Sequence, residues 1–395
     1  MKQYFKSIIN LPISIKLFLI TEALFGFAMG LWSLDLNFHF KANGLTDIKI
    51  GAVVSFGLFI TAGISIFAGI LADRIGYRPV MVLGCLIQGI GMICLALFSN
   101  VVFVYISQFL YGFGSAFILS SEFPFITGLV EEKFKKLVYN LLISTYLLAM
   151  VLGNFLGGSL PSWFSKSTNP YFFGIIASGV CFILMAIGRS MLPDYRVVVQ
   201  TKRRLFSIAW DKKILSYLFY GLFLNIFLNI VNSMLNLVFR DRYELADNTI
   251  GVIYSVVSIV GSIAAFIVPY LAGRFKGENT ALVTIIMQSV FIFCMSFAGT
   301  FIFSFLVIAR TFVGCITQGN VDSAMLQSVN EHERGSYSGM RIFSNNIGMA
   351  IGAAIAGAFT MSRNYVLLFL TAGGFTILQI IVYTFTYRKY FSKEE

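Results

Sequence analysis

Five ionisable side chains lie inside long apolar segments of this chain, where charged groups are expensive and usually serve function. They are Glu22, Asp35, Glu122, Arg310 and Asp322. An apolar environment favours the neutral form of a carboxyl group, so each acid could take up and release a proton near neutral pH. These residues therefore point to proton transfer within a membrane.

The acids differ in the roles that their positions suggest. Glu22 lies deepest within its apolar run and is our first choice as a coupling acid. His39 follows Asp35 by about one helical turn, so the two could form an outer proton relay, or both could simply sit in the wet interface. Glu122 and Asp322 are 200 residues apart and could occupy similar depths in two related halves, or could cap helix contacts.

Four carboxamides form a second group, at Asn225, Asn229, Asn232 and Asn236. Steps of 4, 3 and 4 residues at about 100° each would place them within about 60° of arc on one continuous helix. A carboxamide facing lipid is costly, so this face must meet protein or water. The alternative to a binding role is hydrogen bonding between helices.

The elements that position these groups must be membrane helices. Hydrophobic residues make up 57% of the 395 residues and charged residues 12%, against roughly a quarter in soluble domains. Twelve apolar runs of about 20 residues are each long enough to cross a bilayer, and each must be helical to satisfy its backbone. Their centres lie near residues 26, 60, 90, 114, 149, 180, 226, 261, 289, 313, 350 and 375. The sequence thus predicts an all-α integral membrane protein.

The chain repeats itself at a spacing of 200 residues. Residues 69–78 reappear in altered form at 269–278, and Asp47/Asp247, Gly51/Gly251 and Ser55/Ser255 precede the two copies. Repeated apolar helices are typical of secondary transporters built from two related halves. We expect a six-helix bundle over 1–188, a cytoplasmic linker over 189–213, with a short interfacial helix within 197–208, and a second bundle over 214–395.

The net charge of +11 follows membrane topology and does not indicate a nucleic-acid partner. With a cytoplasmic N-terminus, 22 Lys and Arg fall in cytoplasmic segments and six in outer loops, which predicts that both termini are cytoplasmic. The same charges can contact anionic lipid. The first helix lacks a cleavage site and is expected to remain as an anchor, and all five cysteines lie in apolar runs as buried thiols.

The spacing G-x-L-A-D-R-x-G-x-R at residues 69–78 resembles the loop signature between helices 2 and 3 of the major facilitator superfamily. Gly69 would permit close helix approach and Gly76 a tight turn, while Arg74 and Arg78 would lie in the basic cytoplasmic layer. Asp73 could accept hydrogen bonds from a neighbouring helix N-terminus, and the resemblance implies that it helps to close a cytoplasmic gate between the halves. Tyr77 replaces a residue that is usually basic.

Three further segments resemble the same family. Residues 331–335 are similar to its pattern between helices 10 and 11. Residues 153–158 resemble its antiporter motif with Asn154 in place of proline, and Gly348, Gly352 and Gly357 are the counterparts in helix 11, which favours a helix-packing role. Gln108 occupies the position of an arginine in the family's proton-antiporter pattern.

The resemblance implies twelve helices in two pseudo-symmetric six-helix bundles that alternate access to a midplane site. In this family helix 7 lines the central cavity, so the asparagine stripe becomes a candidate site for a neutral, hydrogen-bonding substrate. Arg310 is expected to pair with an acid or to bind an anionic substrate group, and Asn345 and Tyr146 complete the substrate-binding candidates.

We therefore expect a small-molecule transporter in the cell membrane, without enzymatic activity, cofactor or metal, and monomeric. Proton-coupled efflux of an amphiphilic or drug-like compound fits the short loops and the altered antiporter motif best. Proton-coupled uptake or flipping of a polar metabolite or lipid is the alternative, and a non-transporting membrane sensor is the second alternative.

Overall fold

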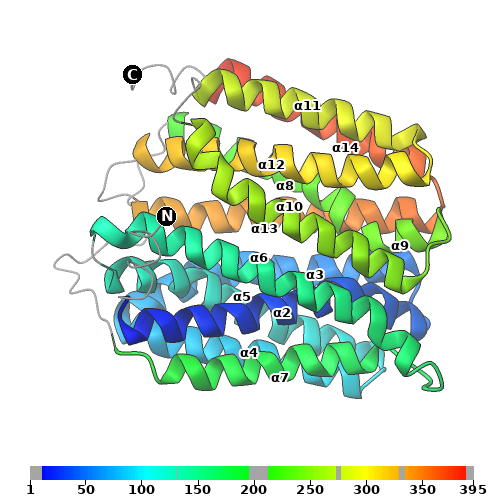
Figure 1. The fold of residues 1–395 in the computed structure, drawn as a ribbon, viewed down its shortest axis with the longest axis horizontal. Helices are drawn as coiled ribbons and strands as arrows, with labels where there is room; N and C mark the ends of the chain where they lie inside the picture. The colour runs from blue at the N-terminus through cyan, green and yellow to red at the C-terminus, as the bar shows by residue number, and fades with distance from the viewer. Residues whose placement is uncertain (1–10, 131, 195–211, 273–276, 329–333, 388–395) are drawn as a thin grey trace.

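The computed structural model describes residues 11–130, 132–194, 212–272, 277–328 and 334–387. Within these ranges all regular structure is helical (Figure 1). The first half contains α2 (Ile13–Ala42), α3 (Asp47–Ile75), α4 (Tyr77–Leu97), α5 (Val101–Leu129), α6 (Glu132–Trp163) and α7 (Phe172–Ser190). The second half contains α8 (Lys212–Asn232), α9 (Leu235–Asp241), α10 (Asp247–Ala272), α11 (Gly277–Phe297), α12 (Thr300–Ser328), α13 (Arg334–Met361) and α14 (Tyr365–Val382), followed by the π-helix η1 (Tyr383–Tyr387).

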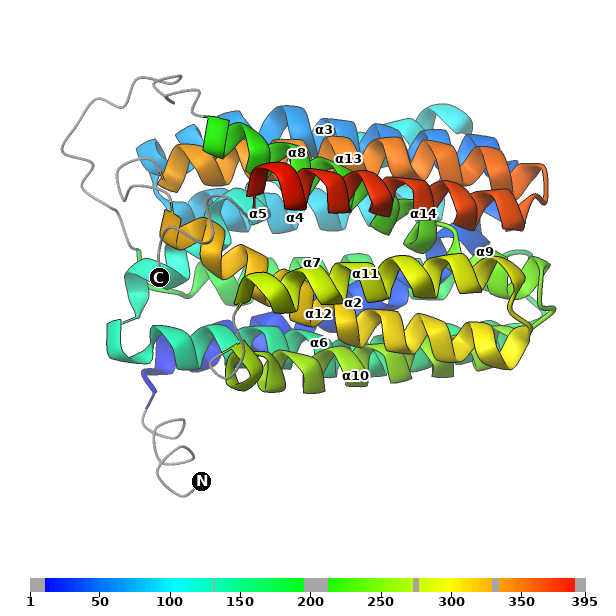
Figure 2. The same cartoon turned by 90° about the horizontal axis from the view of Figure 1, so that it is seen from above.

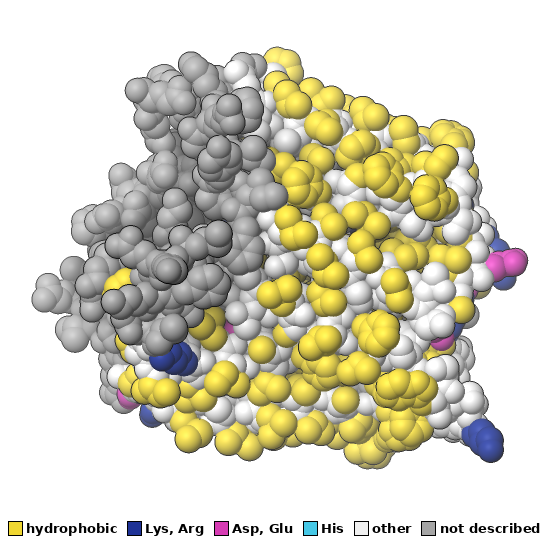
Figure 3. Space-filling view, in the orientation of Figure 1, with side chains coloured by type: hydrophobic (Ala, Val, Ile, Leu, Met, Phe, Trp, Pro, Cys, Tyr) yellow, Lys and Arg dark blue, Asp and Glu magenta, His cyan; other side chains and the backbone are white. Residues whose placement is uncertain are grey.

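Within the described part of the chain, twelve spans are long and apolar enough to cross a membrane, as the apolar runs predicted. Helices α2–α7 and α8–α14 occupy separate regions of the molecule (Figure 1), and α2 begins at the end where α14 finishes (Figure 2). We call this the terminal end and the opposite one the far end. On the face shown in Figure 3, hydrophobic side chains cover the broad middle, which suits contact with lipid.

Two equivalent helix crossings join the halves, α3 with α13 and α6 with α10. A Cβ added to Gly51 would lie 3.0 Å from the Cα of Gly357, and one added to Gly251 would lie 2.9 Å from the Cα of Gly158. The backbones can meet this closely only because both partners are glycine. This confirms the packing role expected for the glycines of residues 153–158 and their helix 11 counterparts.

The repeat also places equivalent hydroxyl groups at these crossings. Ser55 donates a hydrogen bond to the Ala350 carbonyl at 2.6 Å, and Ser255 donates one to the Val151 carbonyl at 3.0 Å. Asn154, which stands where the antiporter motif has proline, donates to Ser258 Oγ at 3.0 Å on the other half. The altered motif therefore contributes a bond between the halves.

The seventh span is broken, so the single asparagine face is wrong. Helix α8 ends at Asn232 and α9 begins at Leu235, with a turn between them. The side chain of Asn236 accepts the backbone N–H of Leu237 at 2.9 Å, and such local bonds compete with continuous helix. Asn236 consequently lies on a different helix from the other three asparagines.

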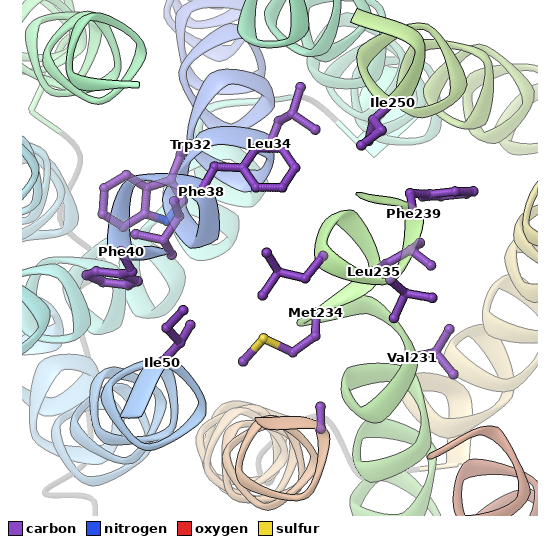
Figure 4. Close-up of a cluster of buried hydrophobic side chains, with 14 of the residues drawn as sticks. Trp32, Leu34, Phe38, Phe40, Ile50, Val231, Met234, Leu235, Phe239 and Ile250 are labelled. Atoms are coloured by element: carbon purple, nitrogen blue, oxygen red, sulfur yellow. The ribbon is translucent and has the colours of Figure 1, made fainter. Parts of the chain in front are cut away.

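The far end is filled by a hydrophobic cluster drawn from both halves (Figure 4). Side chains of α2 and α3 meet those of α8, α9 and α10, including Trp32, Phe38, Phe40, Ile50, Val231, Met234, Phe239 and Ile250. All of these are buried, so the halves are in contact and closed at this end. The cysteines only partly fit the expectation of buried thiols, because Cys294 is exposed on α11.

Candidate functional site

A buried ion cluster joins three helices of the first half. Arg189 on α7 is fully buried, and its Nη2 lies 3.0 Å from Glu22 Oε2 on α2 and 2.8 Å from Glu122 Oε1 on α5. Its Nε also donates to Thr21 Oγ1 at 3.4 Å, and its guanidinium lies 4.8 Å from the centre of the Phe18 ring. We call Glu22, Glu122 and Arg189 the acid–arginine cluster.

The acid–arginine cluster can hold one exchangeable proton. Two ionised carboxylates against one guanidinium leave a net charge of −1, which is costly in a buried place. Protonation of either acid makes the cluster neutral while the other acid stays paired with Arg189. The structure thus brings together two of the predicted proton-coupling candidates, Glu22 and Glu122.

Arg189 was missed as a site residue by reasoning from the sequence. Because Arg189 stands at the edge of an apolar run, the sequence predicts that it belongs to the basic linker. In the structure it lies in the last turn of α7. The available signal was charge balance. The first half contains three intramembrane acids, which need a cation when they are buried, and its sixth apolar run ends in Arg189.

Asp35 on α2 is the second buried acid. Its side chain is 0% exposed, and neither carboxyl oxygen has a hydrogen-bond partner among the described residues. Its Oδ2 occupies the space beside Gly174 on α7, where an added Cβ would lie only 1.7 Å away. An unpaired acid in such a place is most stable in its neutral form, which suits a proton carrier.

The expected relay between Asp35 and His39 is not formed in this conformation. The His39 ring is instead bonded to Asn43 and Asn169, at 3.0 and 3.1 Å, and to the Leu95 carbonyl at 3.3 Å. Successive turns of α2 point the two side chains in different directions, Asp35 towards Gly174 and His39 towards Asn43 and Asn169. The wet-interface alternative is also wrong, because both residues are buried.

Charged and polar side chains close the far end around the hydrophobic cluster. Lys41 Nζ lies 2.9 Å from Asp241 Oδ2 of the second half and 2.9 Å from Asp47 Oδ1 of its own half. Asn37 donates to Asn236 Oδ1 at 2.8 Å, and Asn236 donates to the Leu34 carbonyl at 2.7 Å. One member of the predicted asparagine stripe therefore holds the halves together.

Tyr171 extends this closure. Its hydroxyl donates to Asp247 Oδ2 at 2.6 Å and accepts from Arg240 Nη1 at 3.0 Å. Arg240 also covers the Phe38 ring, with 4.0 Å between the guanidinium carbon and the ring centre. Burial and the bond to the Asp247 carboxylate raise the pKa of Tyr171, so its hydroxyl remains a donor.

The other three asparagines of the stripe have different partners. Asn229 donates to the Met349 carbonyl on α13, which is the interhelical role, and Asn225 donates to the Gly221 carbonyl one turn back at 2.8 Å. Asn225 and Asn345 also line a pocket of about 50 Å³ with Tyr217, Tyr220, Gly221, Leu224, Leu228, Gln318 and Arg341. Asn232 accepts a bond from Arg310 Nη2 at 2.6 Å.

Arg310 forms no ion pair with any described acid. It is only 5% exposed, and among the described residues its Nε has no partner and its one hydrogen bond goes to a neutral amide. Pairing with Glu22, Asp35 or Glu122, one of the two expectations for this residue, is therefore not observed, and the side chain of Asp322 lies outside the described residues. Tyr146 on α6 packs edge-on against Phe25 at 5.3 Å between ring centres, and so lies where α6 meets α2.

The motif at residues 69–78 is only partly as expected. Gly76 has φ of 103°, which confirms the tight turn. Asp73 accepts from the Tyr77 hydroxyl at 2.6 Å, so the residue that replaces a basic one serves as a hydrogen-bond donor. Arg78 donates to the Leu192 carbonyl at 2.8 Å, and Arg74 is exposed. No described atom of another helix lies within 4 Å of a Cβ added to Gly69, so close helix approach is not seen there.

Some predicted features lie outside the described part of the chain. The side chain of Asp322 on α12 is among them. So are most of residues 331–335 and the interfacial helix expected within 197–208.

Comparisons with known proteins agree with this architecture. Residues 13–340 match the family model described as Major Facilitator Superfamily. "Multidrug resistance protein MdtH" of Salmonella typhimurium (strain LT2) is 23% identical over 325 residues, covering 79% of this chain and 76% of that protein. The corresponding protein of Salmonella arizonae shares the same identity and coverage.

Two solved structures show the same fold. The nucleoside transporter NupG has a TM-score of 0.73 at 16% identity, covering 95% of this chain and 99% of that one. A bacterial homolog to the human lysosomal transporter Spinster, in an inward-facing and occupied conformation, has a TM-score of 0.75 at 12% identity, covering 95% and 96%. With its twelve apolar spans and its family match, this multi-pass membrane transporter of a small molecule belongs to the major facilitator superfamily.

Proposed function

We propose that this protein is a proton-coupled exporter of a small amphiphilic compound, located in the cell membrane with both termini in the cytoplasm. The observation that carries the proposal is the acid–arginine cluster, in which two acids share one buried cation. The distribution of Lys and Arg supports the orientation. The relatives named as multidrug resistance proteins support export of a drug-like compound.

The closed far end corresponds, in this orientation, to a state that is closed to the outside. A proton that enters from outside neutralises the acid–arginine cluster and lowers the cost of keeping it buried while the halves rearrange. In the state open to the cytoplasm the proton leaves, and the cluster regains its charge. Asp35, buried nearer the far end, is a second position at which a proton could be carried.

Proteoliposomes with an imposed pH gradient test the proposal. We would measure gradient-driven movement of ethidium, 4-phenylbutyrate and uridine, which represent a drug-like cation, an amphiphilic anion and a nucleoside. Glu22→Gln and Glu122→Gln are each expected to reduce driven transport about tenfold or more while leaving exchange without a gradient intact. The matched control is Glu244→Gln, which removes an exposed acid outside the spans. Driven transport that survives both cluster substitutions would refute coupling through this cluster.

Uptake of a polar metabolite is a second candidate function. It is favoured by the pocket of about 50 Å³, whose lining includes the amides of Asn225, Gln318 and Asn345. A nucleoside transporter among the fold neighbours agrees with this candidate. Accumulation of uridine in the direction of the proton gradient, without movement of ethidium or 4-phenylbutyrate, would favour uptake over export.

A further inference from the structure

The second half carries a buried cation for which the described residues provide no counter-ion. Arg310 is 5% exposed and lies within a span that crosses the membrane. Its guanidinium stays charged, and a buried charge without a partner is destabilising unless something neutralises it. The first half solves the same problem at Arg189 with two carboxylates.

Arg310 also bridges two separate packing groups of helices. Helix α12 packs against α10 and α11, whereas α8 packs against α13 and α14. The bond from Arg310 to Asn232 therefore reaches from one group to the other. Asn232 is exposed, so this pair borders open space.

The pocket described above is lined by the same two helices and by α13. Gln318 is eight residues after Arg310 on α12, and Asn225 is seven before Asn232 on α8. These separations correspond to about 12 Å and about 10 Å along the helices, towards the terminal end. A ligand roughly 10 Å long could thus span the distance from the guanidinium to the amides of the pocket.

We infer that Arg310, supported by Asn232, binds the carboxylate or other anionic group of the transported compound, whose body extends towards the pocket lined by Asn225, Gln318 and Asn345. The substrate class is then an amphiphilic organic anion. This inference rests on the proposed transport function. It assigns substrate charge recognition to the second half and proton binding to the first.

Binding to the purified full-length protein tests the inference without any gradient. We would compare apparent Tm with 4-phenylbutyrate, its neutral amide 4-phenylbutyramide and the cation 4-phenylbutylamine, because a ligand that binds the folded state raises Tm. Stabilisation is expected from the carboxylate and not from the amide or the amine. Equal shifts with the carboxylate and the amide, including no shift with either, would overturn the inference.

Substitutions at Arg310 test whether this residue is responsible for the binding of 4-phenylbutyrate. Arg310→Gln is expected to weaken 4-phenylbutyrate binding about tenfold to a hundredfold, and Arg310→Lys to weaken it less, since Lys keeps the charge but loses the planar donor pair. Lys166→Gln, which removes an exposed positive charge in a loop, is the control and should bind normally. Unchanged carboxylate binding in Arg310→Gln would also overturn the inference.

Asn232→Asp provides a test that does not depend on the stability of Arg310→Gln. An aspartate here supplies the missing counter-ion, so the ligand-free protein should gain about 2 °C or more in apparent Tm and lose its response to 4-phenylbutyrate. A lower Tm together with an intact response would contradict the inference. The binding measurements involve no proton gradient. Anion binding at Arg310 can therefore be refuted while proton-driven transport is observed, and proton-driven transport can be refuted while anion binding is observed.

Discussion

Lys41 and Asp241 are 200 residues apart, the period of the internal repeat, and their Nζ and Oδ2 atoms are 2.9 Å apart. Equivalent positions of the two halves thus meet at the far end. A pseudo-two-fold relation between the halves brings such positions together near its axis. The same geometry explains the contact between Asn37 and Asn236, which are 199 residues apart.

Removing the Lys41–Asp241 pair should favour opening of the far end. Both side chains are partly exposed, so Asp241→Ala is expected to destabilise the closed state by at most about 1 kcal/mol, or roughly fivefold in population. The readout is labelling of Met234→Cys, at a position buried in the closed state, by a membrane-impermeant maleimide. Asp47→Ala is the control because it removes a partner of Lys41 within the same half, and equal acceleration by both would contradict a role specific to the contact between halves.

The hydrogen bond from Tyr171 to Asp247 should be independent of pH in the physiological range. The pKa of Tyr171 is raised in the folded protein. The hydrogen bond therefore contributes fully to the stability of the closed state below the ordinary tyrosine pKa of about 10, and this contribution is lost only as pH rises above that value. Tyr171→Phe should therefore speed labelling of Met234→Cys by the same factor at pH 6 and pH 8. A factor that differs between these pH values would show that another group controls this contact.

The place of Asp35 beside Gly174 predicts a specific pair of substitutions. Gly174→Ala puts a Cβ 1.7 Å from Asp35 Oδ2, so we expect overpacking to destabilise the protein by about 1–3 kcal/mol. Asp35→Ala removes the obstructing group and should restore the apparent Tm of Gly174→Ala. Gly63→Ala is the control, because no described atom of another helix lies within 4 Å of a Cβ added to Gly63. If Asp35→Ala and Gly174→Ala were simply additive, the two positions would not be in contact.

Loss of Arg189 should be among the most destabilising changes in the first half. Arg189→Gln leaves two buried acids without a cation, and breaking buried pairs of this kind costs about 3–5 kcal/mol. The loss of apparent Tm should be smaller at pH 5 than at pH 8, because protonated acids need no counter-ion. Adding Glu22→Gln to Arg189→Gln should recover part of the lost apparent Tm at pH 8. A loss of apparent Tm that is the same at pH 5 and pH 8 would argue against unpaired charge as the cause.

Local sequence patterns were sufficient to predict much of the fold. The apolar runs predicted all twelve spans, since a membrane helix must satisfy its own backbone and the signal is therefore local. The spacing of 200 residues predicted two related halves, and Gly51/Gly251 and Ser55/Ser255 prove to be the positions where the halves meet. The turn at Gly76 followed from local chemistry in the same way.

The candidate sites were less predictable because partners lie far apart in sequence. Nothing local showed that Arg189 belongs with Glu22, 167 residues earlier, or that Arg310 would meet an amide and no described acid. The asparagine stripe assumed one straight helix, and the break after Asn232 gave its members separate partners.

The sequence by itself determined the membrane environment, the number of spans, the internal repeat and the acids that stand in costly positions, because each of these follows from residue type and spacing along the chain. Only the tertiary structure decided which charges neutralise one another. A buried charge is stabilised by atoms within a few ångströms. Packing of distant helices alone brought two acids to Arg189 and left Arg310 with a single neutral partner among the described residues.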